Sequence, residues 1–310
     1  MVWKRPNRVP LIGEADASAG IAEVYNEIKS LLRVPQVPPL FQMYAGNGGF
    51  LTQFWRAVKP VLRTRAFTGS VERLSADAYT RMYNYFAVEG QAMSGDPALR
   101  ELARTVEMFQ FQDAALLLLL SFTAEAFDNP VGQASASPEE APLPVFAFSP
   151  AMPPEPEMSA QTARILDEAR RQSGVGIAPI ELRALAASPD FLDHYWRNWK
   201  HISESPLLAA CENQLLLHAR ELAHQLPGPV EFSFAALRES GVEEEDFSGI
   251  VRLTHQWNRA FARQLLQAVA AKIALEGGSG AARMRPDPEK KDPEAPKEVG
   301  KKEETPTRAA

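Results

Sequence analysis

Apolar residues recur every three or four positions along much of the chain. One such series occupies the first part of the chain and another its last third: Ile21, Val24, Tyr25, Ile28, Leu31 and Leu32, then Ile250, Leu253, Trp257, Phe261, Leu265 and Ala268. This spacing places the apolar side chains on one face of a helix. Strand-like alternation does not persist beyond a few residues. The pattern therefore predicts an all-α fold.

The most hydrophobic run extends from Ala114 to Phe122. It is much shorter than the roughly 20 apolar residues that a membrane-spanning helix needs. We therefore expect Leu116 to Leu120 to form a helix that is buried on all sides, and we expect no membrane partner.

Two changes in composition divide the chain. Residues 128–159 are too rich in proline for a continuous helix, and residues 277–310 interleave Pro, Lys and Glu with almost nothing apolar. The predicted organisation is a first helical repeat over 1–127, a proline-rich linker over 128–159, a second repeat over 160–276 and a disordered tail over 277–310. PVFAFSP, within the linker, is apolar enough to pack on the surface as a strap.

The two halves align with each other at a constant offset of 141 residues. Ten of the 39 positions from Ile21 to Lys59 meet an identical residue, against about two or three expected from composition alone. The proline-marked turns RVPQVPPLF and GVGIAPIEL fall at matching places. An offset of 145 extends the match toward the ends of the halves and sets Asp113 opposite Asn258. The chain is thus predicted to be a pseudo-dimer of two tandem repeats, with any site at the seam between them.

The charge of the chain argues against a nucleic-acid partner, and its cysteine content argues for a reducing compartment. The 310 residues carry a net charge of -6, and no basic stripe gathers on one segment, so a nucleic-acid partner is not expected. Cys211 is the single cysteine, which excludes an intrachain disulfide and suits a reducing cytoplasm. The first 20 residues lack the apolar core of a signal peptide, which also favours a cytoplasmic protein.

The familiar cofactor motifs are missing from the sequence. It contains no G-x-G-x-x-G, P-loop, G-x-S-x-G or H-E-x-x-H. Glu221 and His224 have the spacing of a carboxylate-bridged metal bundle, but a second such motif would be needed and the first half has none. We therefore predict neither a metal nor an organic cofactor.

The stretch ASPDFLDHYWRNWK differs from its counterpart GNGGFLTQFWRAVK by a carboxylate, because Asp190 stands opposite Gly49. A structural explanation is available, since Ser188 is a good N-cap and an acid in the first turn is favoured by the helix dipole. The functional alternative is that Asp190 faces a cavity at the seam as a general base. Local sequence leaves both explanations open, and Trp257 is likewise either core or ligand contact.

The combination IAEVYNEIKSLLRVPQVPPLF, FLTQFWRAVKP and a second copy containing ASPDFLDHYWRNWK resembles the group I 2-haloacid dehalogenases, over roughly Leu11 to Ala274. The resemblance implies an all-α protein of two related repeats, often dimeric, with its active site between them. It also implies cofactor-free hydrolysis of small 2-haloalkanoic acids of either hand, in which an Asp activates a water that displaces halide with inversion at C2. A small anionic substrate and a homodimer are the implied partners.

The resemblance also assigns roles to individual residues. Asp190 matches the family's base, with Ser188 beside it as a donor to the substrate. Asp113 falls at or near the asparagine that aims the water, so the chain departs from the family at this place. An Asp close to Asp190 would raise the pKa of one of the two acids by like-charge coupling. Substrate contacts are implied for Phe41, as part of the aromatic wall, and for Trp257 and Asn258 on the second repeat.

Two alternatives belong to other classes. The first is a helical small-carboxylate-binding or structural protein that has kept the fold and lost activity, and Asp113 in place of asparagine is the feature that favours it. The second arises because EDFSGIVRLTHQWNRAFARQLL resembles the closing helices of alkylhydroperoxidase and carboxymuconolactone decarboxylase folds. The redox version of that fold needs a cysteine pair near a histidine, which Cys211 alone cannot supply.

Overall fold

A computed structural model of the chain describes residues 11–46, 49–90, 97–133, 144 and 150–280. The described residues form α-helices and two short 3-10 turns, η1 (Glu14–Asp16) and η2 (Glu155–Glu157), with no strand among them. The predicted all-α fold is confirmed.

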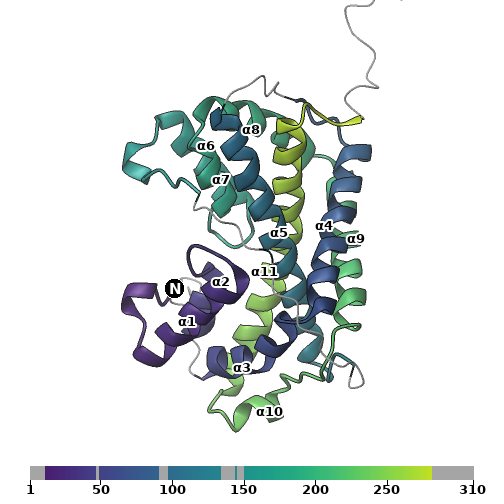
Figure 1. The fold of residues 1–310 in the computed structure, drawn as a ribbon. Helices are drawn as coiled ribbons and strands as arrows, with labels where there is room; N and C mark the ends of the chain where they lie inside the picture. Colours follow the sequence, from purple (N-terminus) through teal and green to yellow (C-terminus); the bar gives the residue numbers. More distant parts are fainter. Residues whose placement is uncertain (1–10, 47–48, 91–96, 134–143, 145–149, 281–310) are drawn as a thin grey trace, which may run out of the picture.

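Two long helices form the centre of the molecule (Figure 1), α5 (Pro97–Ala126) and α11 (Glu244–Leu275). They are antiparallel, because Lys272 lies 3.9 Å from Glu107 at one end of the pair while Ser121 hydrogen-bonds Asn258 at 3.2 Å toward the other. Both helices are buried along most of their length, as expected for helices that are apolar on several sides.

The leucine run in α5 is enclosed as predicted. All five residues from Leu116 to Leu120 are buried against neighbouring helices. Among the described residues, α5 alone is long and apolar enough to cross a membrane by length and composition, and 89% of its most apolar window is buried inside the protein. Its hydrophobicity is therefore accounted for by the core.

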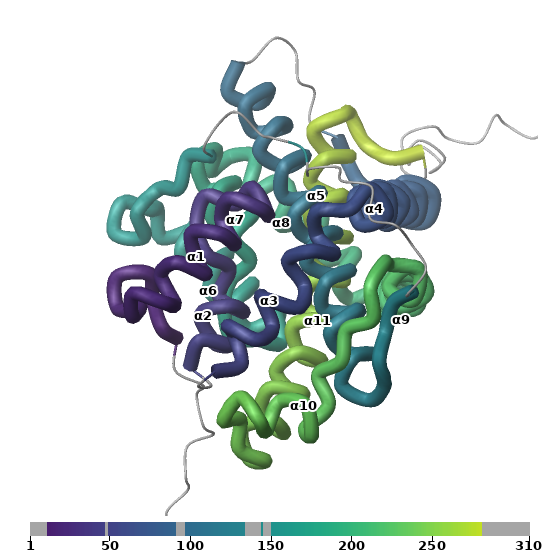
Figure 2. The backbone as a smooth tube through the Cα atoms, turned by 60° about the horizontal axis from the view of Figure 1, so that its bottom comes forward, coloured from purple at the N-terminus to yellow at the C-terminus, as the bar shows by residue number. Residues whose placement is uncertain are grey.

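The helices that precede α5 and α11 follow a similar order in the two halves of the chain. The first half supplies α1 (Ala19–Leu32), α2 (Pro39–Ala45), α3 (Phe50–Leu62) and α4 (Arg65–Tyr85) before α5. The second half supplies α6 (Ala160–Gln172), α7 (Ile180–Leu185), α8 (Pro189–Ser203) and α9 (Pro206–Ala223), then the short α10 (Phe234–Arg238), before α11. Figure 1 shows α1 and α2 below α6 and α7 on one side of the α5–α11 pair, with α4 and α9 together on the other. Figure 2 shows the same molecule with α1, α2 and α3 toward the viewer.

A tryptophan, a glutamate and a lysine make the same contact in both halves. The Trp55 indole donates to Glu27 at 2.7 Å, and Lys59 reaches the same carboxylate at 2.6 Å. The matching indole of Trp196 donates to Glu168 at 2.8 Å, and the Lys200 ammonium lies 2.6 Å from that carboxylate. The residues that the 141-residue offset aligns thus perform the same structural role.

The turns after α1 and α6 also correspond. Arg33 closes α1 in the left-handed region at φ 56°, and Gly174, its partner at the same offset, has φ 73°. Each turn then ends at a proline that precedes the next helix, Pro38 before α2 and Pro179 before α7. Proline cannot donate a backbone hydrogen bond and has a preset φ, so each proline fixes the entry of its chain into a short helix.

The predicted linker and tail lie partly outside the described residues. Within 128–159, Met152 packs on the cluster of Met108, Phe109 and Ala184, as a surface strap would, while most of PVFAFSP is not described. The tail begins later than predicted, because Ser279 is fully buried and its hydroxyl donates to the carbonyl of Phe86 at 2.6 Å. Residues 281–310 are outside the described part.

Gly49 is explained by close backbone contact. A Cβ at this position would lie 2.7 Å from the carbonyl oxygen of Ser240. We expect Gly49→Ala to lower the free energy of unfolding by about 1–3 kcal/mol, because the approaching backbone has to move. Gly69→Ala is the matched control: it meets nothing within 4 Å in α4 and should raise stability by about 0.5–1 kcal/mol. Urea unfolding of both variants checks this, and equal effects would contradict it.

Candidate active site

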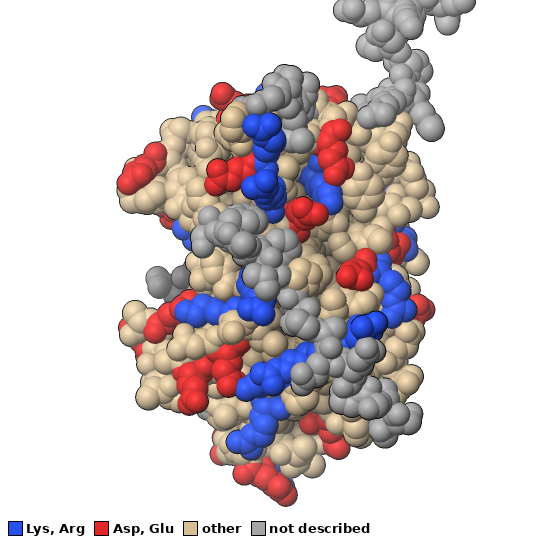
Figure 3. Space-filling view, in the orientation of Figure 1, with Lys and Arg blue, Asp and Glu red and all other residues tan. Residues whose placement is uncertain are grey.

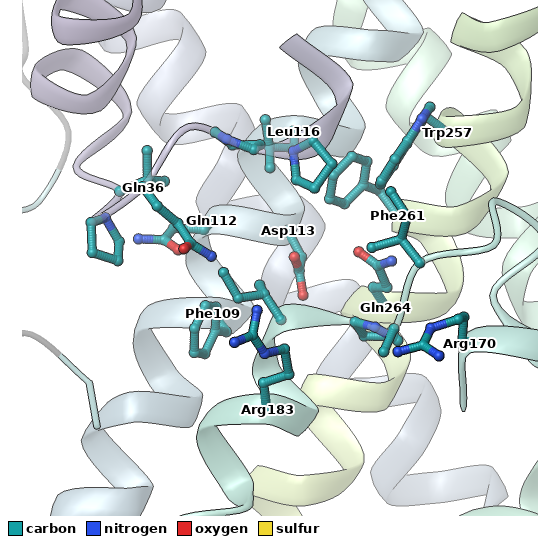
Figure 4. Close-up of a pocket in the computed structure, with 18 of the residues that line it drawn as sticks. Gln36, Phe109, Gln112, Asp113, Leu116, Arg170, Arg183, Trp257, Phe261 and Gln264 are labelled. Carbon is teal, nitrogen blue, oxygen red and sulfur yellow. The ribbon is translucent and has the colours of Figure 1, made fainter. Parts of the chain in front are cut away.

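A cavity of about 200 Å³ lies between the two halves. Its walls come from the turns before α2 and α7, from α5 and from α11 (Figure 4). Its lining includes Asp113, Arg183, Phe109, Leu116, Trp257 and Phe261. This volume is below that of typical drug-sized pockets and suits a molecule of a few heavy atoms.

Asp113 of α5 lines the cavity and is nearly inaccessible to solvent. The residue is only 2% exposed to solvent, and the Oδ2 atom of its carboxyl has no hydrogen-bond partner among the described residues. Burial raises the pKa of Asp113 well above its usual range, and the nearby Glu181 carboxyl raises it further. Both effects favour the neutral form of the Asp113 carboxyl.

Glu181 is the second buried acid, in the first turn of α7. It is 2% exposed, and both of its carboxyl oxygens lack a hydrogen-bond partner in the described structure. Burial raises the pKa of Glu181 to about 8, although its own backbone N–H offsets part of the rise. Glu181 is not itself a lining residue, whereas its neighbour Ile180 is.

Arg183 supplies a positive charge at the cavity. Figure 4 shows its guanidinium extending from α7 toward the space below Asp113. Its Nε is buried without a hydrogen-bond partner, and no described carboxylate forms an ion pair with it. Arg170, the other lining arginine, is already paired with Asp167 at 2.6 Å. Arg183 is therefore the cation that is available to an anionic ligand.

The opposite side of the cavity is apolar and rigid. Phe109 and Leu116 come from α5, while Trp257 and Phe261 come from α11, with their ring centroids 5.4 Å apart. The Trp257 indole N–H points to the Met43 sulfur at 3.3 Å, so its polar end is held away from solvent. Such a wall can hold an alkyl group or a large, weakly hydrated leaving group.

Comparisons with known proteins find relatives of the chain. A family model described as halocarboxylic acid dehydrogenase DehI matches residues 35–179, a range that includes Asp113 and runs from the first proline turn to the second. A curated (R)-2-haloacid dehalogenase from Pseudomonas putida is 19% identical over 264 residues, covering 79% of this chain and 86% of the relative. Another from Rhizobium sp. (strain NHG3) is 22% identical over 242 residues, covering 72% and 91%.

Solved structures share the fold. A D-2-haloacid dehalogenase mutant in complex with D-2-CPA, and the D-2-haloacid dehalogenase with L-LA, each align with a TM-score of 0.78 at 17% identity. The alignments cover 86% of this chain and 96% of theirs. The chain is thus similar to 2-haloacid dehalogenases in sequence and shares their fold, which confirms the predicted resemblance.

The cavity differs from the predicted site in its candidate base. Asp190 is exposed in the first turn of α8 and does not line the cavity. Ser188, predicted to donate to the substrate, is the N-cap residue of α8 and also lies outside the cavity; its side chain makes no capping hydrogen bond. This geometry does not support Asp190 as the base. A solvated carboxylate in a helix's first turn, stabilised by the dipole, explains the residue instead.

The other predicted contact residues divide between the cavity and the core. Asp113 and Trp257 line the cavity. Phe41 is completely buried among aromatic rings of the first half, with Tyr44 and Phe54 as neighbours, and Asn258 is buried with its amide oxygen accepting from Ser121. Neither contacts the cavity, because each is used within the helix packing.

The histidines of α9 are engaged in ion pairs. His218 lies 3.0 Å from Asp77, and His224 lies 3.2 Å from Glu125. No group of three or more His, Cys, Asp or Glu side chains suited to a metal ion occurs among the described residues.

Glu181 is the residue that sequence reasoning missed. At the 141-residue offset it stands opposite Leu40, which is completely buried. The sequence contained one signal for Glu181: a carboxylate stands where the first half has an apolar residue, Leu40. A buried acid without a partner is costly to the fold and is therefore a candidate for function.

Proposed function

We propose that the chain hydrolyses small 2-haloalkanoic acids in this cavity, with Glu181 as the base and neutral Asp113 orienting the attacking water. The observation that carries the proposal is the meeting of two buried acids without partners, one from each half, beside an arginine that no described carboxylate neutralises. The curated relatives named (R)-2-haloacid dehalogenase support the substrate class.

The proposal includes a pseudo-dimeric origin for the site. The two halves share their order of helices, their turn geometry and their Trp–Glu–Lys contact. Two related units that pack through α5 and α11 create a seam that neither unit has alone. Only one base is needed at such a seam, so Glu181 opposite Leu40 is the expected kind of asymmetry.

Glu181 is assigned as the base because its pKa of about 8 lies close to neutral pH. A base must be deprotonated when the substrate is bound, and a pKa near the working pH combines that state with a strong pull on the proton. Its carboxyl oxygens have no hydrogen-bond partner among the described residues, which leaves them available to a water at Asp113. Catalytic hydrogen bonds often tighten only when the substrate is present.

Neutral Asp113 has the hydrogen-bonding capacity of the family's asparagine. A protonated carboxyl offers one O–H donor and one carbonyl acceptor, as an amide offers N–H and carbonyl groups. Burial and the adjacent Glu181 keep Asp113 in this form. The departure from the family sequence is therefore compatible with the orienting role.

The chemical step is a direct displacement at C2. The water oxygen bonds to C2 as the carbon–halide bond breaks, halide leaves with the bonding pair, and Glu181 takes a proton from the water. Backside attack inverts C2, and the products are a 2-hydroxy acid and halide. The dry cavity positions the water and strengthens the electrostatic interactions.

Arg183 binds the substrate carboxylate in this scheme. A charge-assisted hydrogen bond to a buried guanidinium is strong, and no described carboxylate competes for Arg183. The alkyl group and halogen then lie against Trp257 and Phe261.

Arg183→Met should raise the KM for 2-chloropropanoate about 10- to 100-fold, because a lost hydrogen bond to a charged group costs about 1.5–3 kcal/mol. The loss should appear mainly in KM, since the carboxylate is bound in both ground and transition states. Initial rates over a range of substrate concentrations measure this. Arg197→Met is the control, because Arg197 is 69% exposed on α8 and pairs with Asp193. A similar change in both variants would remove Arg183 from substrate binding.

The proposed function is tested by halide release from the separate enantiomers of 2-chloropropanoate. We expect halide and lactate of inverted configuration. A single turnover in ¹⁸O-water should label the lactate, since the water attacks carbon directly. Label that enters a protein carboxylate first would contradict direct attack. Saturable binding of 2-chloropropanoate without halide release would reject the hydrolase in favour of the carboxylate-binding alternative.

A further inference from the structure

We propose that a groove on the outer face of the first half binds a small anion that carries two or more phosphate groups. The groove lies between α1 and α3, and none of its lining residues lines the cavity between the two halves. The inference therefore adds a second binding site and does not depend on the proposed hydrolysis.

Two adjoining hollows form the groove. One, of about 820 Å³, runs along α1, and the other, of about 460 Å³, is lined mainly by α3 and the residues that follow it. Both hollows are bordered by Glu23, Glu27, Lys59 and Arg63, so they are continuous. Each is larger than the cavity of about 200 Å³ and lies in the size range of small-molecule sites.

Four cationic side chains line the groove: Arg33, Arg56, Lys59 and Arg63. Lys59 pairs with Glu27 at 2.6 Å, whereas no described carboxylate forms an ion pair with any of the three arginines. Arg56, Lys59 and Arg63 are three and four residues apart, so they form one row along α3. Figure 3 shows a band of basic side chains across the lower part of the molecule, where Figure 1 shows α1 and α3.

Arg33 carries two local costs that a bound anion would offset. It closes α1 at φ 56° and is the one described residue other than glycine with a positive φ. This left-handed conformation favours glycine, which occupies the matching position, Gly174, in the second half. The Nε of Arg33 is also buried without a hydrogen-bond partner in the described structure. Backbone strain and an unpaired buried donor together indicate a functional position.

The second half provides an internal comparison for the charge of the groove. The 16 lining residues carry four positive and two negative charges, a net of +2, while the 16 residues at the 141-residue offset carry four of each. In the second half Arg197 pairs with Asp193 at 3.2 Å, but Thr52 replaces this acid beside the matching Arg56. Since the two scaffolds are alike, helix packing does not require the excess positive charge.

The lining favours a hydrophilic, highly charged ligand over a protein segment. Guanidinium groups present paired N–H donors that match phosphate oxygens. Trp55 is the one aromatic residue among the described lining residues; it is 2% exposed and its indole N–H already donates to Glu27. The groove therefore offers neither an aromatic anchor for a partner protein nor a stacking surface for a nucleobase. Recognition is limited to the phosphate groups of the ligand.

Isothermal titration calorimetry of the full-length protein with inorganic triphosphate tests the proposal. We expect saturable binding of one triphosphate, weakened by added salt. Arg33→Gly should weaken binding at least about tenfold, because a guanidinium contact to the anion is lost. This variant has the residue that the second half uses in the same left-handed position, so it should remain folded. Arg197→Met removes one positive charge from the second half and should change the affinity less than about twofold.

Glu23→Gln should have the opposite effect to Arg33→Gly. Glu23 borders both hollows, and its carboxylate repels a bound anion. Its removal should tighten triphosphate binding about two- to fivefold, the usual range for an exposed charge pair. The same titration measures this change, and weaker binding in Glu23→Gln would contradict a site in the groove.

The remaining outcomes also decide the proposal. Absence of saturable binding, or equal weakening in Arg33→Gly and Arg197→Met, would overturn the site. Displacement of triphosphate by 2-chloropropanoate would place the anion in the cavity and contradict the groove. ATP that binds more than about tenfold tighter than inorganic triphosphate, or hexaglutamate that binds as tightly, would contradict recognition of phosphate groups alone. None of these results bears on halide release, so this inference and the proposed function can fail separately.

Discussion

Glu181→Gln is expected to reduce kcat for halide release about 10²- to 10⁴-fold, the usual contribution of a positioned general base. The glutamine amide has nearly the same volume and cannot accept the proton from water. Because the wild-type side chain is neutral below its pKa of about 8, the substitution introduces no new buried charge and should leave the fold intact. Circular dichroism and urea unfolding establish that the variant is folded.

Asp190→Asn is the matched control for this experiment. It also replaces one carboxylate by an amide in the first turn of a helix of the second half. Asp190 is exposed and outside the cavity, so halide release should change by less than about twofold. A large loss in Asp190→Asn with an active Glu181→Gln would restore Asp190 as the base and exclude Glu181 from that role.

Glu181→Gln is also expected to stabilise the protein at alkaline pH, by an amount of the order of a few kcal/mol at pH 8. The native pKa of about 8 lies above the ordinary value of 4.5 that an unfolded chain has. Between these values the native state keeps a proton that the unfolded state has lost, so stability falls as pH rises. This loss of stability is absent at pH values below 4.5, the pKa in the unfolded chain, and complete at pH values above about 8, the pKa in the native protein. Removing the titrating group removes this slope.

Urea unfolding of wild type and Glu181→Gln at pH 5 and pH 8 measures the effect. The difference in unfolding free energy between the two proteins should be larger at pH 8 than at pH 5. Asp190→Asn, with its carboxylate exposed, should show no such growth. Parallel stability changes in Glu181→Gln and wild type would show that Glu181 ionises freely in the native state.

Much of the fold could be predicted because it depends on local periodicity. The spacing of apolar residues defines the helices, and the composition of the leucine run in α5 requires a buried helix. The offset of 141 residues aligns Trp55 with Trp196. The hydrogen bonds that the two indoles donate to Glu27 and Glu168 agree with this alignment. The start of the tail was harder to predict, since the burial of Ser279 depends on distant backbone near Phe86.

The site was only half predictable because its chemistry depends on burial. Asp113 was identified, and its place in the cavity agrees with a functional role. Asp190 was assigned as the base mainly through the family resemblance. Its difference from Gly49 has a structural cause, because a Cβ at Gly49 would lie 2.7 Å from the carbonyl oxygen of Ser240. Glu181 looked like an ordinary acid in a first helical turn, where the dipole favours it. Only the packing of α7 against α5 shows that this carboxyl is enclosed.

Charged side chains of both signs lie on the surface. On the face in Figure 3, acidic and basic side chains are interspersed over the upper part, and basic side chains form a band across the lower part. Inside the cavity, the proposal assigns the attraction of an anionic substrate to Arg183.

The pH dependence of kcat/KM for halide release, measured for wild type and Asp113→Asn, tests the buried acid pair most directly. We expect the wild-type rate constant to rise with pH to a plateau above about 8, as Glu181 loses its proton. In Asp113→Asn the rise should stay near the same pH, because burial is the main cause of the raised pKa of Glu181 and an uncharged side chain remains beside it. A wild-type profile that is flat from pH 5 to pH 9, or one that Asp113→Asn moves to much lower pH, would contradict a Glu181 base beside a neutral Asp113.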